Sequence, residues 1–159
     1  MSPFNLFFLV SLVCGVSLSL SAEDAALKTN SLESVEIRNA AYRKMILHVS
    51  DELRDSSACI FIDVATNELY SITNLLSSLP RYVTTAAFAK LDRFGVRHDT
   101  ITNRKGVLLQ VGSIRKLDGI AETDCLILYA RGLSSLYDLS LERSTNQWVV
   151  RRVRFKVGS

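Results

Sequence analysis

The chain has 159 residues, of which 48% are hydrophobic and 22% are charged, and its formal net charge is +3 at pH 7. This composition excludes a disordered protein, and the absence of any fixed-period repeat excludes a solenoid. No linker rich in proline, glycine or serine interrupts the chain, so we expect one domain behind the N-terminal segment.

An uncharged apolar run, FNLFFLVSLVCGVSLSL, occupies residues 4–20. It is shorter than the roughly 20 residues that a membrane-spanning helix needs, and small residues follow it. The sequence therefore predicts a signal peptide over residues 1–22 and a single α+β domain over residues 23–159, secreted or periplasmic. Because no basic residue precedes the run, an uncleaved N-terminal membrane anchor stays open as the alternative.

The charge is distributed unevenly along the predicted domain. From Glu23 to Pro80 there are five basic and nine acidic residues, a net charge of −4, whereas Arg81 to Ser159 holds fourteen basic and seven acidic residues, a net charge of +7. The basic half favours an acidic or anionic partner. Export would separate the protein from nucleic acid, and cleavage of the leader would leave no membrane span.

Two amphipathic helices are predicted in the acidic half. The first runs from about Ser31 to Arg54, because its apolar side chains recur at three- and four-residue steps. The second opens at Thr66 or Asn67 and ends at Leu79, since the residue before a proline is biased out of the helical region. Each helix has one apolar face to bury.

Short segments rich in β-branched and aromatic residues predict strands. The turn Asn103–Gly106 is expected to join two of them, with Gly106 at positive φ. Because short turns join most of these segments, we expect an antiparallel meander. The predicted strands are Ala58–Val64, Tyr82–Phe88, Val96–Thr102, Val107–Ile114, Cys125–Arg131, Leu136–Glu142 and Trp148–Val157.

The last hairpin predicts its own register. Apolar and polar residues alternate on both strands around a turn at residues 144–146. Matching the apolar faces places Asp138 opposite Arg152 or Arg154, which predicts an exposed ion pair worth at most about 1 kcal/mol.

The order of these elements predicts an α+β fold with two N-terminal helices packed on a curved antiparallel sheet of about five or six strands. A long helix lying across such a sheet resembles, in outline, the cystatin-like and NTF2-like folds. The resemblance is an analogy of architecture and implies no function.

Two cysteines, Cys59 and Cys125, follow the leader. An oxidising compartment would permit a disulfide between them, and closing that loop would contribute about 4 kcal/mol. Each cysteine also opens an apolar strand, where a free thiol is a common buried side chain. The sequence leaves both alternatives open.

Signals of catalysis are weak. The sequence holds no nucleophile motif, no zinc-protease motif and no Cys-x-x-Cys pair, so we expect no catalytic residues, no metal site and no cofactor. His48 falls away from the apolar stripe of the first helix and is expected to be solvated. His98 and Asp99 are adjacent, so on a strand they would point to opposite faces and could not pair.

Basic residues form the best candidate surface. The turns and alternate positions of a meander bring together Arg104, Lys105, Arg115, Lys116, Arg152, Arg154 and Lys156, with Trp148 beside them as an anchor for a partner or a cover for the end of the sheet. Like charges on a final strand also prevent edge-to-edge association, which is an alternative explanation of the same pattern.

These features predict an exported, non-enzymatic binding or accessory domain, such as an inhibitor, an immunity-type protein or an envelope-associated protein. Its expected partner is an acidic protein or an anionic envelope component. The alternative is a small hydrolase or ligand-binding cone with a pocket between the long helix and the sheet.

Overall fold

The computed structural model describes residues 32–53, 57–64 and 82–158. The chain divides into two compact units, Met1–Ser34 and Val35–Ser159, and everything described below belongs to the second apart from residues 32–34 at the start of the helix. The predicted signal peptide, its alternative as an anchor and the predicted helix at residues 66–79 lie outside the described residues.

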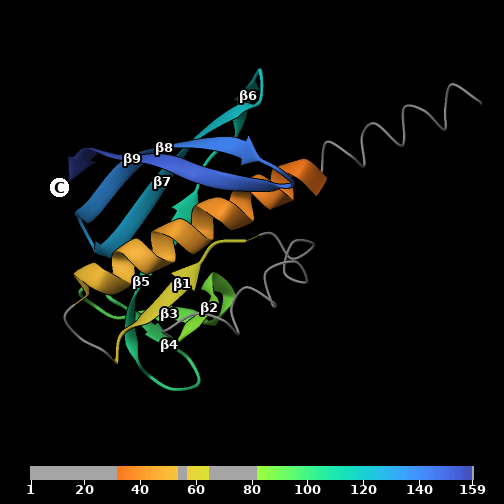
Figure 1. The fold of residues 1–159 in the computed structure, drawn as a ribbon. Coiled ribbons are helices and arrows are strands. Elements are labelled where there is room, and N and C mark those ends of the chain that lie inside the picture. Colours follow the sequence, from red (N-terminus) through yellow and green to blue (C-terminus); the bar gives the residue numbers. More distant parts are fainter. Residues whose placement is uncertain (1–31, 54–56, 65–81, 159) are drawn as a thin grey trace, which may run out of the picture. The chain divides into compact units, whose positions relative to one another are not determined.

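Within these residues the fold is α+β, as predicted, with one α-helix and one sheet (Figure 1). The sheet has nine strands, more than the five or six that the sequence predicts. The helix spans residues 32–52, close to its predicted bounds. A 3-10 helix, η2 (Ala86–Phe88), follows the second strand. The strands are β1 Cys59–Ile62, β2 Val83–Thr85, β3 Ala89–Leu91, β4 Arg97–Asp99, β5 Lys105–Val111, β6 Arg115–Leu117, β7 Ile120–Ala130, β8 Leu133–Ser144 and β9 Gln147–Gly158.

The helix packs across one face of the sheet, which we call the inner face (Figure 1). Apolar side chains at helical spacing are fully buried against alternate residues of β1, β5, β7 and β8, which form one continuous core. The Tyr42 hydroxyl donates a hydrogen bond to the main-chain oxygen of Asp63, and burial raises the pKa of Tyr42 to about 12. The buried helical residues are Ile37, Ala41, Tyr42, Met45, Ile46 and Val49.

The sheet is mixed, which corrects the prediction of a purely antiparallel one. Its order is β2-β1-β5-β7-β8-β9, and β1 runs parallel to both β2 and β5. A parallel pair needs a crossover of a dozen or more residues, and the 20 residues between Ile62 and Val83 provide that length. All four residues of β1 are buried, as is usual for a strand that is covered on both faces.

Gly106 allows β1 and β5 to approach each other. It pairs with Cys59, and a Cβ atom at this position would lie 2.3 Å from the Cys59 carbonyl oxygen and 2.5 Å from its Sγ atom. The prediction of a turn glycine with positive φ is therefore wrong, since Gly106 lies within β5 and Asn103 takes the positive φ, 57°. Gly106 allows the backbones of β1 and β5 to pack closely.

Strands β5, β7, β8 and β9 form the antiparallel meander that the sequence predicts. The two-residue turn Thr145–Asn146 joins β8 to β9, with Thr145 at a φ of 56°. Asp138 pairs with Arg154, which confirms one of the two predicted registers. Arg151 and Lys156 are extra residues at two β-bulges, where the register shifts.

The outer face of the sheet carries a second, smaller core. Cys59, Phe61 and Leu108 are buried there, covered by Ala86 and Ala89 with the neighbouring Leu128. This core lies over β1 and β5, and the outer face of β7, β8 and β9 extends beyond it.

The two cysteines do not form the candidate disulfide. Both are free and buried, Cys59 in the outer core and Cys125 in the inner one. They pair with Gly106 and Val111 of β5, a separation of about 16 Å along the strand, well beyond the roughly 7 Å that a bridge spans. Burial raises the pKa of Cys59 to about 11 and that of Cys125 to about 12, so neither thiol is a ready nucleophile.

Candidate functional site

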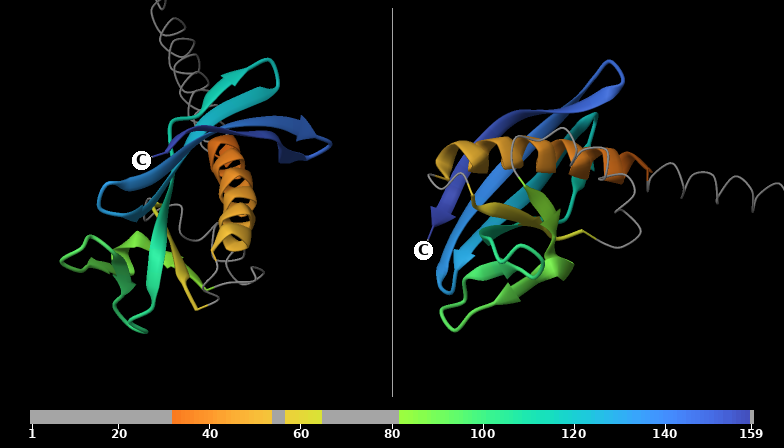
Figure 2. Two further views of the ribbon diagram at one scale, coloured as in Figure 1. Left: turned by 90° about the vertical axis from the view of Figure 1, so that its left-hand side faces the viewer. Right: turned by 90° about the horizontal axis from the view of Figure 1, so that it is seen from below.

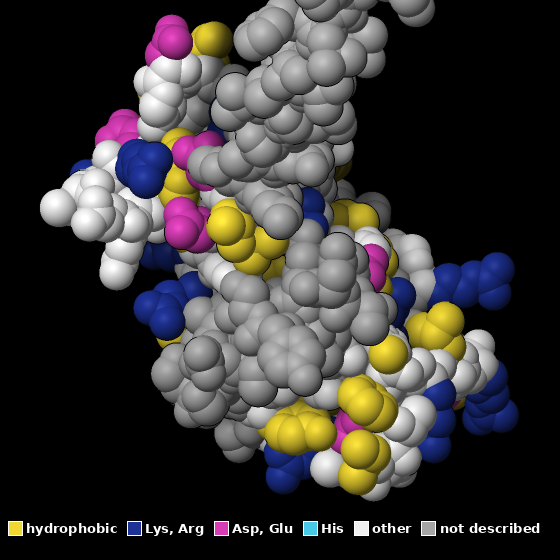
Figure 3. All heavy atoms as spheres, turned by 90° about the vertical axis from the view of Figure 1, so that its right-hand side faces the viewer, with side chains coloured by type: hydrophobic (Ala, Val, Ile, Leu, Met, Phe, Trp, Pro, Cys, Tyr) yellow, Lys and Arg dark blue, Asp and Glu magenta, His cyan; other side chains and the backbone are white. Residues whose placement is uncertain are grey.

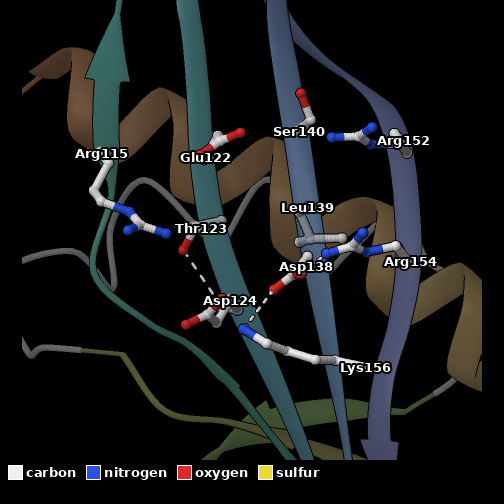
Figure 4. A pocket seen from close by; sticks show the side chains of 10 residues that line it. All are labelled: Arg115, Glu122, Thr123, Asp124, Asp138, Leu139, Ser140, Arg152, Arg154 and Lys156. Carbon is white, nitrogen blue, oxygen red and sulfur yellow. Dashed lines mark hydrogen bonds and ion pairs between the residues drawn. The ribbon is translucent and has the colours of Figure 1, made fainter.

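A polar hollow of about 220 Å³ lies on the outer face of β6, β7, β8 and β9 (Figure 4). Because successive side chains of a strand alternate between faces, the residues that lie between the core positions of these strands gather here. The hollow is lined by Arg115, Glu122, Thr123, Asp124, Asp138, Leu139, Ser140, Arg152, Arg154 and Lys156. Four of these residues are basic and three are acidic, a net charge of +1.

One row of side chains crosses all four strands. In the register of the strands, Arg115 lies opposite Glu122, Glu122 opposite Ser140, and Ser140 opposite Arg152. The two arginines stand at opposite ends of the row, and Figure 4 shows both guanidinium groups directed inward over the sheet. Neither group has an ion-pair or hydrogen-bond partner among the residues that the structure describes.

In the next row, two acidic and two basic side chains balance each other's charge. Asp138 lies opposite Asp124 and Arg154, and its carboxylate accepts hydrogen bonds from the Arg154 guanidinium at 2.9 Å and from Lys156 Nζ at 3.2 Å. These two bonds, Arg154 first, lower the pKa of Asp138 to about 2. Lys156, the extra residue of this β-bulge, is thus the second cation bonded to the Asp138 carboxylate.

The hollow is equipped for binding anions. Guanidinium groups present a planar fork of donors that matches the oxygens of carboxylate, sulfate or phosphate. Among the four cations that line the hollow, Arg115 and Arg152 have no anionic partner in the described chain, and they flank the hollow from opposite sides. Its described lining contains no histidine and no cysteine.

The structure therefore brings together four of the predicted basic residues and leaves the others elsewhere. Arg104 lies with its guanidinium carbon 5.4 Å from the centre of the Tyr82 ring, and Lys105 begins β5. Lys116 follows Arg115 on β6 and points to the opposite face of that strand. Trp148 is 7% exposed and belongs to the inner core, which suits a cover for the end of the sheet.

His98 and Asp99 of β4 stabilise the turns on either side of that strand. His98 Nε2 lies 3.2 Å from Asp92 Oδ2, and Asp99 Oδ2 accepts hydrogen bonds from the main-chain nitrogen and the hydroxyl of Thr102. The hydroxyl bond is the main cause of a lowered pKa for Asp99. As the sequence predicts, the two neighbours do not pair with each other.

The expectation of a solvated His48 is met only in part, because the side chain is 35% exposed and belongs to a cluster that the sequence did not indicate. Its ring meets Tyr137 edge to face at 5.1 Å, and its Nε2 lies 3.2 Å from Glu52 Oε1. The hydroxyls of Tyr129 and Tyr137 each donate to Glu52 at 3.4 Å. Burial, with Glu52 next, raises the pKa of Tyr137 to about 12. The cluster ties the end of the helix to β7 and β8.

The space between the helix and the sheet is occupied by apolar core side chains of the described residues. His48 lies on the helix, while His98 and Asp99 lie on β4, so these residues do not line a common cavity. No group of three or more potential metal ligands occurs among the described residues.

Comparisons with known proteins returned no matching family model, no matching curated protein and no matching solved structure. In the part of the chain that the structure describes, no helix combines the length and the apolar character that crossing a membrane requires.

Proposed function

We propose that this chain is an exported, non-enzymatic binding domain that recognises an acidic protein or another anionic component of the cell envelope through the polar hollow. The observation that carries the proposal is the pair of arginines, Arg115 and Arg152, which face each other across the hollow without an ion-pair partner among the described residues. A cation held on a sheet with no internal partner is available to an external anion.

The surroundings support recognition by shape as well as charge. Arg154 and Lys156 share the Asp138 carboxylate, which keeps them beside the hollow, and Glu122 separates the two unpaired arginines. An anionic group that enters the hollow must fit between Glu122 and the arginines, so the acidic residues restrict where it binds.

Export through residues 1–22 and cleavage to a domain over residues 23–159 are part of this proposal, with an N-terminal anchor as the alternative. We also propose that residues 66–79 form a second helix, because their apolar spacing and the parallel β1–β2 connection both favour one.

Binding of poly-L-glutamate, an acidic polymer, tests the proposal by isothermal titration calorimetry at low ionic strength. The double variant Arg115→Ala/Arg152→Ala removes both unpaired guanidinium groups, each of which would contribute a charge-assisted hydrogen bond. We expect binding to weaken by about tenfold or more, with the free energy of unfolding within about 0.5 kcal/mol of the original because both side chains are exposed.

The matched control is Lys105→Ala/Lys116→Ala, which removes the same charge from two exposed positions outside the hollow. It should bind poly-L-glutamate nearly as well as the original chain, apart from a small general effect of charge. Equal weakening in both double variants would mean that net charge alone drives binding, and the hollow would lose its role.

A further inference from the structure

Two turns from distant parts of the sequence meet at one end of the sheet, away from the polar hollow. The β3–β4 turn lies beside the β7–β8 turn, as both views of Figure 2 show. A Cβ atom on Gly95 would lie 2.6 Å from Cβ of Arg131, so the two turns are in direct contact. We call the residues that these turns expose the two-turn surface.

Large apolar side chains project from the two-turn surface into solvent. Leu91 is 63% exposed, Phe94 64% and Leu133 53%. An open groove of about 450 Å³ lies between the turns, with Leu128 and Ala130 in its lining. Exposed apolar side chains gathered on two adjoining turns indicate an interaction surface, because their contact with water is unfavourable.

Cations surround these apolar side chains. Arg93 lies with its guanidinium carbon 4.7 Å from the centre of the Phe94 ring, and Arg97 and Arg131 line the groove. Lys90 precedes Leu91 on β3 and points to the other face of that strand. None of the four has an ion-pair partner among the described residues. Figure 3 faces the side of the molecule opposite to the two turns, and there too basic and hydrophobic side chains lie close together in the lower part of the view.

Asp92, the acidic residue of this surface, bonds to neighbouring groups of the same turn and of β4. Asp92 Oδ1 accepts hydrogen bonds from the main-chain nitrogens of Phe94 and Val96 at 2.8 and 2.9 Å, and Oδ2 lies 3.2 Å from His98 Nε2. The Asp92 carboxylate therefore shapes the turn and leaves the four neighbouring cations without a carboxylate partner. The two-turn surface is apolar at its tips and positively charged around them.

We propose that the two-turn surface docks on a lipid bilayer that carries anionic headgroups. The apolar tips of Leu91, Phe94 and Leu133 would enter the boundary between headgroups and acyl chains, while the surrounding cations would meet the headgroup phosphates. Two observations favour a bilayer over an acidic protein. The apolar side chains stand exposed on the two turns, and the Arg93 guanidinium lies over the Phe94 ring, so that an apolar tip and a cation would reach the membrane interface together.

Co-sedimentation of the full chain with vesicles tests the docking. The vesicles contain either phosphatidylcholine alone or equal parts of phosphatidylcholine and phosphatidylglycerol. Leu91→Asp/Phe94→Asp places two carboxylates at the tip and should reduce the fraction bound to anionic vesicles at least about fivefold. Any contribution of the N-terminal segment is common to every variant, so the comparison isolates the turns.

The matched control is Leu117→Asp/Ile120→Asp, which changes a cross-strand apolar pair that is also exposed but lies at the β6–β7 turn. It should sediment with anionic vesicles as the original chain does. Thermal unfolding of both variants identifies any loss of binding that comes from loss of the fold.

Phe94→Trp gives a local readout that the N-terminal segment cannot produce, against the constant signal of the buried Trp148. Its fluorescence should be quenched by brominated phosphatidylcholine when phosphatidylglycerol is present and much less when it is absent. Unquenched fluorescence at saturating anionic vesicles would overturn the proposal. So would equal sedimentation of the two Asp double variants, or weaker binding of Leu91→Asp/Phe94→Asp to poly-L-glutamate alone.

Discussion

The inner and outer faces of the meander are made by the same strands but differ at every second residue. On β7, Ala121, Cys125 and Ile127 are fully buried under the helix, while Glu122 and Asp124 face the polar hollow on the other side. The inner face packs like a protein interior, and the outer face holds charges at positions that the strands fix. Stability and recognition are thus carried by alternate positions of one set of strands.

This difference means that substitutions can separate the two properties. A change on the inner face, or where β1 joins β5, should lower the free energy of unfolding and leave binding per folded molecule unchanged. A change in the hollow should do the reverse, because exposed side chains contribute little to folding.

Gly106→Ala is expected to have the largest effect on stability. The new methyl group would meet the Cys59 carbonyl and thiol at distances that no side chain can accommodate, so β1 must move away from β5. We expect a loss of about 3 kcal/mol in the free energy of unfolding, measured by urea denaturation.

Gly112→Ala is the matched control for that substitution, since its added Cβ atom would have its nearest neighbour, the Asp124 carbonyl oxygen, at an ordinary 3.5 Å. It should change stability by no more than about 0.5 kcal/mol. If the two glycine variants are equally stable, the close β1–β5 pairing is not what requires Gly106.

Asp138→Asn should have a smaller effect on stability and an opposite effect on binding. It removes the carboxylate that holds Arg154 and Lys156, so the net charge of the hollow rises by one and poly-L-glutamate should bind more tightly. Calorimetry under the conditions used for the arginine variants measures the change. Weaker binding would show that Asp138 orients the two cations for the ligand and does more than neutralise them.

The pH dependence of Asp138 follows from the same contacts. Its pKa is lowered from 3.8 to about 2 in the folded chain, so its contribution to stability is complete above pH 4 and is lost as the pH falls from about 4 to about 2. Asp138→Asn should flatten the acid side of the stability curve over that range, and carboxyl NMR of the original chain should give the titration directly.

The sequence predicted the antiparallel part of the fold better than the parallel part, for a physical reason. The Asp138–Arg154 register depends on alternation over two strands joined by a two-residue turn, so the information is local. The pairing of Cys59 with Gly106 joins residues that are far apart in the chain. No local pattern identifies that contact, and a glycine after Asn103 resembles a turn glycine.

The candidate site was likewise predicted in part. Arg152, Arg154 and Lys156 follow from the alternation of β9, and Arg115 from its place beside a turn. Glu122 and Asp124 were missed because β7 was expected to begin at Cys125, whereas it begins at Ile120. The residues before Cys125 are polar on one face and small on the other, so propensity alone does not mark them as a strand.

The most direct test of the account is the location of an anionic ligand on the two faces. Amide NMR shifts recorded during titration with a soluble glutamate oligomer locate it residue by residue. The account predicts that the largest changes occur along the row Arg115, Glu122, Ser140 and Arg152, with the helix and the inner core unchanged. Changes that concentrate on the helix, or that spread evenly over every basic residue, would contradict it.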